Sequence, residues 1–434
     1  MAQTVTTPRP SASASASAAA APRVNGERLW RSLMELARIG ATAKGGVCRL
    51  ALTELDRQGR ELFMRWAREA GLAVRVDAIG NVFARRAGRH AGAGAVMAGS
   101  HLDTQPTGGK FDGCYGVLAA LEAVRTLNDA GIVTDAPLEI AVWTNEEGSR
   151  FVPVMMGSGV FAGAFTLEHA LAAADAQGVT VAQALQAIGF AGEHRDAAPP
   201  RAYFEAHIEQ GPVLEAHGRV IGAVTAALGQ RWYDVAVHGS EAHAGPTPMD
   251  RRHDALLAAS ELVVAVNRIA LDHAPHARST VGYADVYPNS RNVIAGRVRC
   301  SVDLRAPDAA TLQAMDAALH AAARATAAAR QVQIEAKPVV DFAPQPFAAP
   351  LVQAVRDAAR ALGHEPMDVV SGAGHDAVYL ARVAPTAMIF VPCAGGISHN
   401  EIESAEPAHL EAGANVLLRA MLHLAGTGCP LPPA

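Results

Sequence analysis

The chain has 434 residues, of which 50% are hydrophobic and 18% are charged, and its formal net charge is −5. This is the composition of a globular protein with ample material for a core, and its lack of a basic excess argues against nucleic acid and membrane surfaces as partners. The five cysteines are scattered and form no Cys-x-x-Cys pair, so we expect no disulfide framework, no cysteine zinc site and a cytoplasmic location.

The chain begins with a Ser/Ala-rich segment of low complexity, residues 1–23, which we predict to be a disordered tail. It lacks the basic start and the strongly apolar stretch of a secretory signal peptide. No run of about 18 uncharged apolar residues follows, so no transmembrane helix is predicted.

Helices and short apolar strands then alternate. We expect helices from Asn25 and over residues 53–70, the second ending at Gly71. The next predicted elements are a strand or hairpin at 72–84, strands at 95–99, 138–144 and 203–208, and a helix at 113–130. This alternation predicts an α/β fold with a mostly parallel central sheet, in a domain formed by residues 24–228 and 343–434.

The order of elements changes near Gly229. The predicted order is strand 232–237, helix 254–271, strands 280–285 and 298–304, helix 309–330 and strand 332–336. This β-α-β-β-α-β order indicates an inserted ferredoxin-like α+β domain over residues 229–342. From about Phe347 the first pattern resumes, with a helix to 362, a strand at 386–391 and a helix at 406–424.

Metal-binding side-chain types follow the first buried strand. His101 and Asp103 form a His-x-Asp pair, in which the imidazole can bind a metal and the carboxylate can fix its orientation. Asp112 lies eleven residues after His101 in a glycine-rich loop, where a carboxylate can approach closely and bridge two ions. Asp112 could instead be a simple turn or N-cap residue.

Two adjacent carboxylates follow the strand at 138–144. Glu146 and Glu147 repel each other unless a cation lies between them, although a solvated acidic turn would also tolerate them. A division of roles explains the pair: Glu147 binds a metal, while Glu146 holds and deprotonates the attacking water.

His207 and His399 complete the set. A single histidine on a strand is more often a core residue than a ligand, but here the positions agree: His101, Glu147, His207 and His399 all lie at or beyond strand ends of one sheet. With Asp112, three imidazoles and two carboxylates suit two divalent ions, most naturally Zn²⁺, with Mn²⁺, Co²⁺ or Ni²⁺ also compatible. Such a site hydrolyses an amide-like bond without a covalent intermediate.

At these residues the chain resembles a known family. The motifs GSHLDTQPTGGKFDG, WTNEEGSRF, HIEQGPVLE, HGSEAHAGPTPM, SRNVIAG, SGAGHDA and GGISHNE occur in the order seen in the amidases of the hydantoinase/carbamoylase family, which are related to the M20 metallopeptidases. The resemblance spans about residues 26–425. It implies a zinc-exopeptidase-like catalytic domain interrupted by a lid or dimerisation domain, and a homodimer.

The resemblance also implies roles for individual residues. The metal ligands would be His101, Asp112 (bridging), Glu147, His207 and His399; the catalytic base would be Glu146, with Asp103 behind the ligands. His243 would enter the partner subunit's site and stabilise the oxyanion. Substrate contacts would come from Gln210, Asn292, Arg305 and His375, with Arg305 gripping the substrate carboxylate in a bidentate manner.

Two positions depart from the family's usual pattern. Pro246 replaces a threonine in His-Ala-Gly-Thr-Thr-Pro, and Ala295 replaces a proline in Asn-Val-Ile-Pro-Gly. Both lie beside expected substrate contacts and replace none of them, so they bear on substrate preference rather than on the chemistry.

The expected reaction is removal of the carbamoyl group from an N-carbamoyl amino acid, giving ammonia, CO₂ and the amino acid. N-carbamoyl-β-alanine and N-carbamoyl-L-amino acids are the favoured substrates, and the segment 105–109 with Trp143 is most similar to the β-ureidopropionases. The alternatives are an allantoate or ureidoglycolate amidohydrolase, an M20-type dipeptidase and, more remotely, a non-catalytic small-molecule binding protein.

Overall fold

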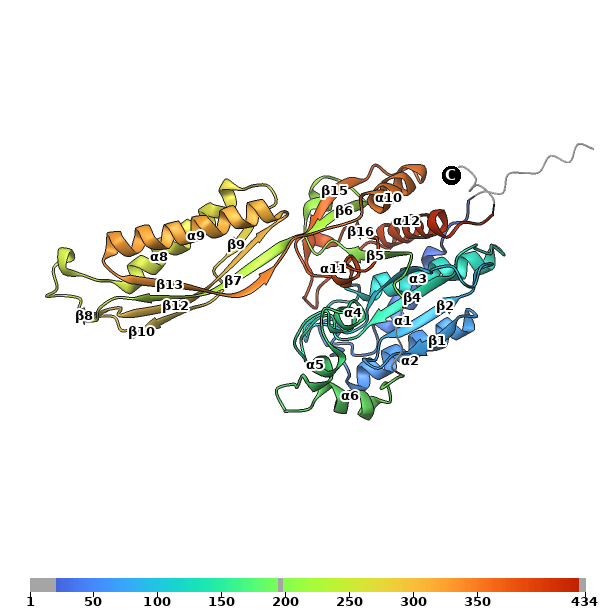
Figure 1. The fold of residues 1–434 in the computed structure, drawn as a ribbon, viewed down its shortest axis with the longest axis horizontal. Helices are drawn as coiled ribbons and strands as arrows, with labels where there is room; N and C mark the ends of the chain where they lie inside the picture. The colour runs from blue at the N-terminus through green and yellow to red at the C-terminus, as the bar shows by residue number, and fades with distance from the viewer. Residues whose placement is uncertain (1–20, 194–197, 429–434) are drawn as a thin grey trace, which may run out of the picture.

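The computed structural model describes residues 21–193 and 198–428, arranged around two separate sheets (Figure 1). The predicted tail falls largely on residues 1–20 and so lies outside the described residues. Among the helices of the described ranges, none combines the length and apolar character needed to cross a bilayer.

The N-terminal elements form where the sequence predicts them. Helix α1 (Gly26–Leu36) starts after Asn25, whose side chain accepts a hydrogen bond from the backbone N–H of Arg28. Helix α2 (Glu54–Glu69) follows an N-cap Thr53 and gives way to Gly71, which has a left-handed φ of 78°. The segment after it is a hairpin of β1 (Ala73–Val76) and β2 (Val82–Arg86).

The larger sheet has nine strands in the order β1-β2-β4-β3-β5-β16-β6-β14, with β15 also paired to β6. Its centre is the parallel set β4 (Leu138–Trp143), β3 (Val96–His101), β5 (Ala202–Ile208) and β16 (Thr386–Val391). All four strands are buried at every position, as expected for parallel strands covered on both faces. The predicted α/β fold with a largely parallel central sheet is thus confirmed, and antiparallel pairs lie toward its edges.

Three strands of the large sheet were not predicted. They are β6 (Gly222–Ala227), β14 (Gln345–Pro346) and β15 (Met367–Ser371). The sequence of β6, Gly-Ala-Val-Thr-Ala-Ala, carries too few branched or aromatic residues to stand out as a strand. It forms one because it pairs with β16, β14 and β15.

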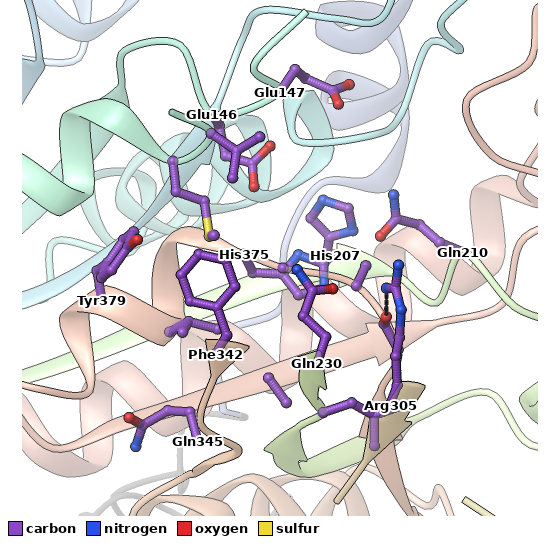
Figure 2. A pocket seen from close by; sticks show the side chains of 18 of the residues that line it. Glu146, Glu147, His207, Gln210, Gln230, Arg305, Phe342, Gln345, His375 and Tyr379 are labelled. Atoms are coloured by element: carbon purple, nitrogen blue, oxygen red, sulfur yellow. Dashed lines mark hydrogen bonds between the residues drawn. The ribbon is translucent and has the colours of Figure 1, made fainter. Parts of the chain in front are cut away.

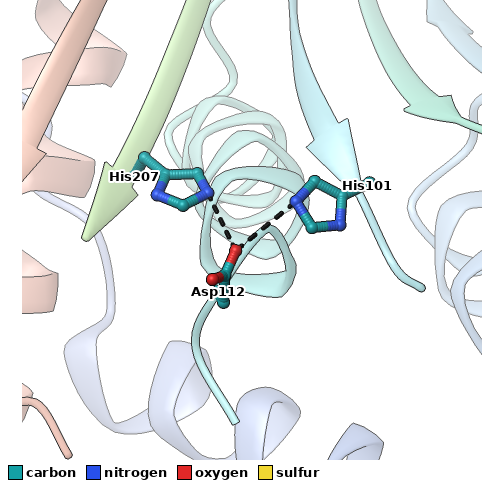
Figure 3. A group of neighbouring side chains, drawn as sticks. All are labelled: His101, Asp112 and His207. Atoms are coloured by element: carbon teal, nitrogen blue, oxygen red, sulfur yellow. Dashed lines mark ion pairs between the residues drawn. The ribbon is translucent and has the colours of Figure 1, made fainter. Parts of the chain in front are cut away.

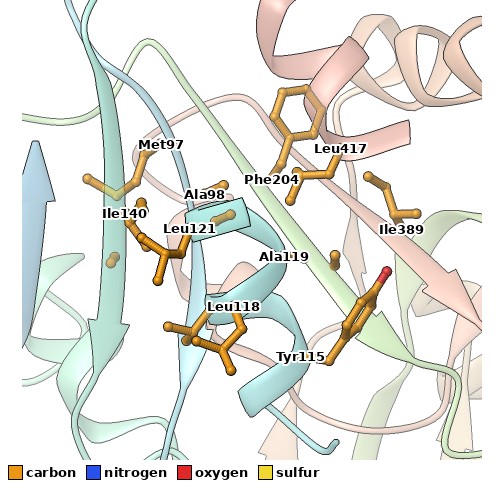
Figure 4. Packing of buried hydrophobic residues seen from close by; sticks show 14 of the residues in the cluster. Met97, Ala98, Tyr115, Leu118, Ala119, Leu121, Ile140, Phe204, Ile389 and Leu417 are labelled. Carbon is orange, nitrogen blue, oxygen red and sulfur yellow. The ribbon is translucent and has the colours of Figure 1, made fainter. Parts of the chain in front are cut away.

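Helices cover this sheet and close its core. Helix α3 (Cys114–Asp129) packs against β3 and β5, and α12 (Pro407–Ala425) packs against α3 and β16. Figure 4 shows Leu118 and Leu121 of α3 among side chains of the central strands, with Leu417 of α12 beside Phe204. The remaining helices of this part are α4 (Met156–Phe161), α5 (Leu167–Ala172), α6 (Val181–Ile188), α7 (Val213–Ala216), α10 (Ala349–Ala361) and α11 (Asp376–Leu380).

The smaller sheet and two helices form a second body, called here the small domain, which projects from the first (Figure 1). Its strand order is β10-β12-β7-β13, with β9 also paired to β12. The strands are β7 (Gly229–His238), β9 (Arg278–Thr280), β10 (Ala284–Tyr287), β12 (Arg297–Ala306) and β13 (Gln333–Phe342); the helices are α8 (Ala255–Asp272) and α9 (Ala309–Arg330). This is the predicted β-α-β-β-α-β order, except that the strand expected at 280–285 is two short strands, β9 and β10.

The register of the small domain fixes which residues face the large sheet. Gln230 of β7 pairs with Arg305 of β12 at the end next to the large sheet, whereas His238 pairs with Arg297 at the other end. Beyond that far end lies a two-stranded ribbon of β8 (Ala242–His243) and β11 (Val293–Ile294) (Figure 1).

Candidate metal centre and active site

The carboxyl ends of the parallel strands bring the predicted ligands to one edge of the large sheet. His101 is the last residue of β3, His207 is the last but one of β5, and Glu147 follows β4. Asp112 comes from the loop between β3 and α3, and His399 from the loop between β16 and α12. Parallel topology therefore explains why residues 298 positions apart in sequence meet.

The carboxylate of Asp112 is the centre of this cluster. Its Oδ1 lies 3.5 Å from Nε2 of His101 and 3.2 Å from Nε2 of His207 (Figure 3). Its Oδ2 lies 3.3 Å from Nε2 of His399, and the same nitrogen is 3.3 Å from Oε2 of Glu147. The five side chains thus form two groups of three that share Asp112, each with its ligand atoms within 4.8 Å of one another.

Backbone carbonyls set the orientation of two of the imidazoles. Nδ1 of His101 lies 2.9 Å from the carbonyl oxygen of Asp103, and Nδ1 of His207 lies 2.9 Å from that of Ile208. Because a carbonyl can only accept a hydrogen bond, Nδ1 carries the proton in both rings. Nε2, the atom turned toward Asp112, is thereby the one available to bind a metal.

Asp103 acts differently from the simple expectation. Its carboxylate is 3.9 Å from the His101 ring, too far for a hydrogen bond, and its backbone oxygen orients that ring instead. The carboxylate oxygens accept hydrogen bonds from the backbone N–H groups of Glu146 (3.3 Å) and Glu147 (3.2 Å). Asp103 therefore shapes the turn that carries the two glutamates.

The charge distribution of the site calls for cations. Asp103, Asp112, Glu146 and Glu147 are all buried within the same small volume. Burial raises the pKa of Glu146 well above its usual range, and burial together with the neighbouring Asp112 charge raises the pKa of Glu147 to about 7. Such crowding of carboxylates is unfavourable unless positive charge is supplied, so the donor set of nitrogens and oxygens fits divalent metal ions well.

A cavity of about 550 Å³ opens beside the metal-binding residues. Both parts of the molecule line it: Glu146, His207, Gln210 and His375 come from the large domain, and Arg305 comes from the small one (Figure 2). A cavity of this size suits a small-molecule ligand.

Arg305 is held at the wall of this cavity. Its guanidinium donates to the carboxylate of Asp303 (2.8 Å) and to the backbone oxygen of Gly372 (2.8 Å), so it bridges the two parts of the molecule. His375 is buried on the opposite domain, with its ring 4.6 Å from that of His207 and its Nε2 2.8 Å from the hydroxyl of Ser371. Burial and the nearby His207 lower the pKa of His375 well below its usual value, which makes it a neutral hydrogen-bonding group.

Comparisons with known proteins identify the family. Residues 97–423 match the model of peptidase family M20/M25/M40. The chain is 49% identical to an N-carbamoyl-L-amino-acid amidohydrolase of Rhizobium meliloti, over 93% of this chain and 97% of the relative. The chain belongs to peptidase family M20/M25/M40. A solved structure of an amidase of the hydantoinase/carbamoylase family from Burkholderia multivorans is 59% identical over 93% of this chain and 98% of its own, with a TM-score of 0.91.

The resemblance seen in the sequence motifs is thereby confirmed, and the chain is a metal-dependent amidohydrolase of the hydantoinase/carbamoylase branch of M20. Relatives with other names are also similar: an allantoate amidohydrolase of Bacillus subtilis is 35% identical over 90% of this chain and 95% of the relative. Membership in the branch therefore establishes the class of reaction and leaves the choice among ureido substrates to the geometry of the cavity.

Asn292, predicted as a substrate contact, and His243, predicted for the partner subunit's site, both lie away from this chain's cavity. His243 is on β8, and Asn292 precedes β11, so both belong to the ribbon at the far end of the small domain (Figure 1). Neither lines the cavity that contains the metal-binding residues. Pro246 and Ala295, the departures from the family pattern, flank the same ribbon and are equally remote from this chain's own cavity.

Several supporting contacts were not predicted from the sequence, including one made by Gln210, which was expected to contact the substrate. Gln105 donates through its backbone and side-chain nitrogens to the carboxylate of Glu147 (3.1 and 2.7 Å), and Gln210 donates to Oδ2 of Asp112 (2.7 Å). Glu403 accepts hydrogen bonds from the backbone N–H groups of Phe111 (2.8 Å) and Asp112 (3.2 Å). Gln105 stood inside a recognised motif, but only the fold shows that Glu403 faces the Asp112 loop.

Backbone strain marks the same region. Asn145, Met155, Gln210 and His399 all have φ between 51° and 57°, in the left-handed region that side-chain-bearing residues rarely adopt. Such strain is typical of functional sites, where the surrounding structure holds it in place. It could not be anticipated from the residue types.

Proposed function

We propose that this amidohydrolase binds two divalent metal ions, most naturally Zn²⁺, and cleaves the carbamoyl group from N-carbamoyl-L-amino acids. The observation that carries the proposal is the pair of ligand groups sharing Asp112, with Glu146 beside them and Arg305 across the same cavity. The products would be the amino acid, CO₂ and ammonia, formed with one molecule of water.

The ligand groups suggest how the ions would be held. His101 and His207 would hold one ion and Glu147 and His399 the other, with Asp112 bridging. Bound ions of this kind polarise the substrate carbonyl and lower the pKa of water. Nε2 of each of the three histidines already lies within 3.5 Å of the Asp112 carboxylate, so little rearrangement of side chains would be needed.

Glu146 is the proposed base. Its Oε2 lies 3.5 Å from Nε2 of His101, at the edge of the metal-binding group and at the wall of the cavity. Because burial raises its pKa, Glu146 is suited to take a proton from the attacking water and to pass it to the departing amide nitrogen. The substrate carboxylate would be gripped by Arg305, whose planar guanidinium offers several donors.

The test of this proposal measures ammonia release from a substrate panel: several N-carbamoyl-L-amino acids, N-carbamoyl-β-alanine, allantoate and a dipeptide. We expect metal-dependent release from the N-carbamoyl-L-amino acids, with a loss of about 10²–10⁴-fold in Glu146→Gln at unchanged metal content. Full turnover by Glu146→Gln would exclude Glu146 as the base. A preference for allantoate or the dipeptide would replace the proposed substrate, and no release from any compound would favour a binding protein.

We further propose that the enzyme is a homodimer in which His243 serves the partner subunit's site. The placement of β8 at the far end of the small domain supports this, because His243 does not line its own chain's cavity. Helix α8 supports it too: Leu257, Val264 and Leu271 are 40%, 69% and 59% exposed and recur every seven residues, so an apolar stripe on one side of α8 is open to a second copy.

Mixed dimers test this second proposal. His243→Ala and Glu146→Gln chains are each expected to be inactive as pure dimers. In the mixed dimer one site contains both an intact Glu146 and an intact His243, so activity should partly return. If mixing restores nothing although mixed dimers form, His243 does not act across subunits.

The small-molecule ureido acid is the partner that this site predicts, and we propose a cytoplasmic location. The latter is supported by the cysteines that the structure describes, since Cys48, Cys114, Cys300 and Cys393 are all unpaired. Cys429 lies outside the described residues.

A further inference from the structure

The cavity has two chemically different sides. Arg305 and Gln210 lie on one side of Glu146 and His207, whereas Phe342 and Tyr379 lie on the other (Figure 2). A substrate whose carboxylate is held by Arg305 would therefore direct its remaining substituent toward the aromatic side.

That aromatic side is built from three separate segments. Met155 precedes α4, Val378 and Tyr379 belong to α11, and Phe342 ends β13 of the small domain. Val154 extends the same wall. Apolar side chains thus form most of the wall of this part of the cavity, and the polar side chains of Gln345 and Arg382 also line it.

Tyr379 is a rigid part of this wall. The residue is 2% exposed, its ring packs edge-on against Phe165 with centroids 5.4 Å apart, and the guanidinium of Arg382 lies 4.9 Å from the ring centre. A ring held from two directions makes a preformed surface, which costs little ordering when a ligand binds. Phe342, by contrast, is 38% exposed and lines the cavity, so an apolar ligand there would cover part of its surface.

We propose that Met155, Phe342, Val378 and Tyr379 form a subsite for the α-substituent of the substrate, and that it accepts large apolar or aromatic side chains. This inference rests on the proposed function, which it deepens by choosing among ureido acids. N-carbamoyl-β-alanine has no substituent to place there. Allantoate would place a second ureido group against Met155, Phe342 and Val378, whose side chains offer it no hydrogen bond, so that Gln345 and Arg382 alone on this side could replace the water it loses.

Steady-state kinetics on the metal-loaded enzyme test the subsite. We expect kcat/KM for N-carbamoyl-L-phenylalanine to exceed that for N-carbamoylglycine by at least about 30-fold. Burial of the phenyl ring removes as much apolar surface from water as burial of several CH₂ groups, and this stabilises the transition state. Phe342→Ala should lower kcat/KM for the phenylalanine derivative by about 10-fold and should lower it much less for the glycine derivative, which has no side chain to place there.

Val339→Ala is the matched control. Val339 is also an exposed apolar residue of β13, 47% open, but it does not line the cavity. It should therefore leave the kcat/KM of both substrates unchanged. A second variant, Val378→Phe, should fill the subsite and lower kcat/KM for the phenylalanine derivative while sparing the glycine derivative.

The outcomes separate the two proposals. Ammonia release from both derivatives with equal kcat/KM, or an equal loss for both in Phe342→Ala, would overturn the subsite while the proposed function stands. A failure to hydrolyse any N-carbamoyl amino acid would overturn both.

Discussion

Glu403 offers the sharpest test of how the protein positions its bridging carboxylate. It is 3% exposed, and one of its oxygens accepts hydrogen bonds from the backbone N–H groups of Phe111 and Asp112. The other oxygen accepts from the hydroxyl of Ser398, next to the ligand His399. One side chain thus ties together the two loops that carry Asp112 and His399.

The expected magnitude follows from these bonds. In Glu403→Ala, two buried N–H groups lose their acceptor, at about 1–3 kcal/mol each, so the free energy of unfolding should fall by about 4 kcal/mol. Residues that orient ligands in this way typically change metal affinity by about 10–100-fold, and we expect a loss in that range. Glu403→Gln keeps an acceptor oxygen for both N–H groups and should lose only about 1 kcal/mol.

Two measurements check this prediction: urea unfolding of the metal-free protein, and competition for metal with a chromophoric chelator. Glu406→Ala is the control, because Glu406 is exposed and makes no side-chain cap bond at the start of α12. If Glu403→Ala does not fold, Gly109→Ala reaches the same contact, since a Cβ there would overlap the Glu403 side chain. Wild-type stability and metal affinity in Glu403→Ala would show that the loop does not depend on this residue.

Two further predictions use matched pairs of residues. Arg60→Met should lower the free energy of unfolding in urea by about 3–5 kcal/mol, because it leaves the fully buried carboxylate of Asp56 without its positive partner. Arg57→Ala, on the exposed side of α2, should not change the free energy of unfolding measurably. Gly113→Ala should release metal and abolish activity, because φ is +63° there and a Cβ would fall on the ring of His101. Gly71→Ala has the same kind of φ with open space around it, so it should cost only about 1–2 kcal/mol and retain the metal content measured by atomic emission. Equal metal content in both glycine variants would contradict the crowding argument.

The candidate metal ligands could be grouped from the sequence because the information that places them is local. Each of His101, Glu147, His207 and His399 follows an apolar run that forms a strand by its own composition, and parallel topology brings such ends together. The same holds for β16, whose bounds match the predicted strand at 386–391.

The features that could not be predicted from the sequence depend on contacts between segments far apart in the chain. The strand β6 depends on its neighbours rather than on its own residues, and Glu403 acts on a loop nearly 300 residues earlier in the chain. The role of Asp103 depends on which of its oxygens is nearer to His101: spacing suggests the carboxylate, but Nδ1 of His101 lies 2.9 Å from the backbone oxygen and 3.9 Å from the carboxylate. Local pattern therefore identifies ligands better than it identifies what holds them.

The small domain explains why a single chain does not assemble every residue that the motifs suggested. Arg305 lies near one end of the antiparallel ladder in which β7 and β12 pair over ten residues, and His243 lies on the ribbon beyond the other end. At about 3.3 Å per residue, such a ladder is about 30 Å long, and its hydrogen bonds keep it from folding back on itself. No hinge movement of this rigid unit can bring both ends to one cavity: a rotation that keeps Arg305 at its own site leaves His243 and Asn292 far from it. The proposed second copy would resolve the conflict, since one small domain could then place Arg305 in its own site and His243 in the partner's site. The mixed-dimer experiment is therefore a test of the fold's geometry as much as of the role of one histidine.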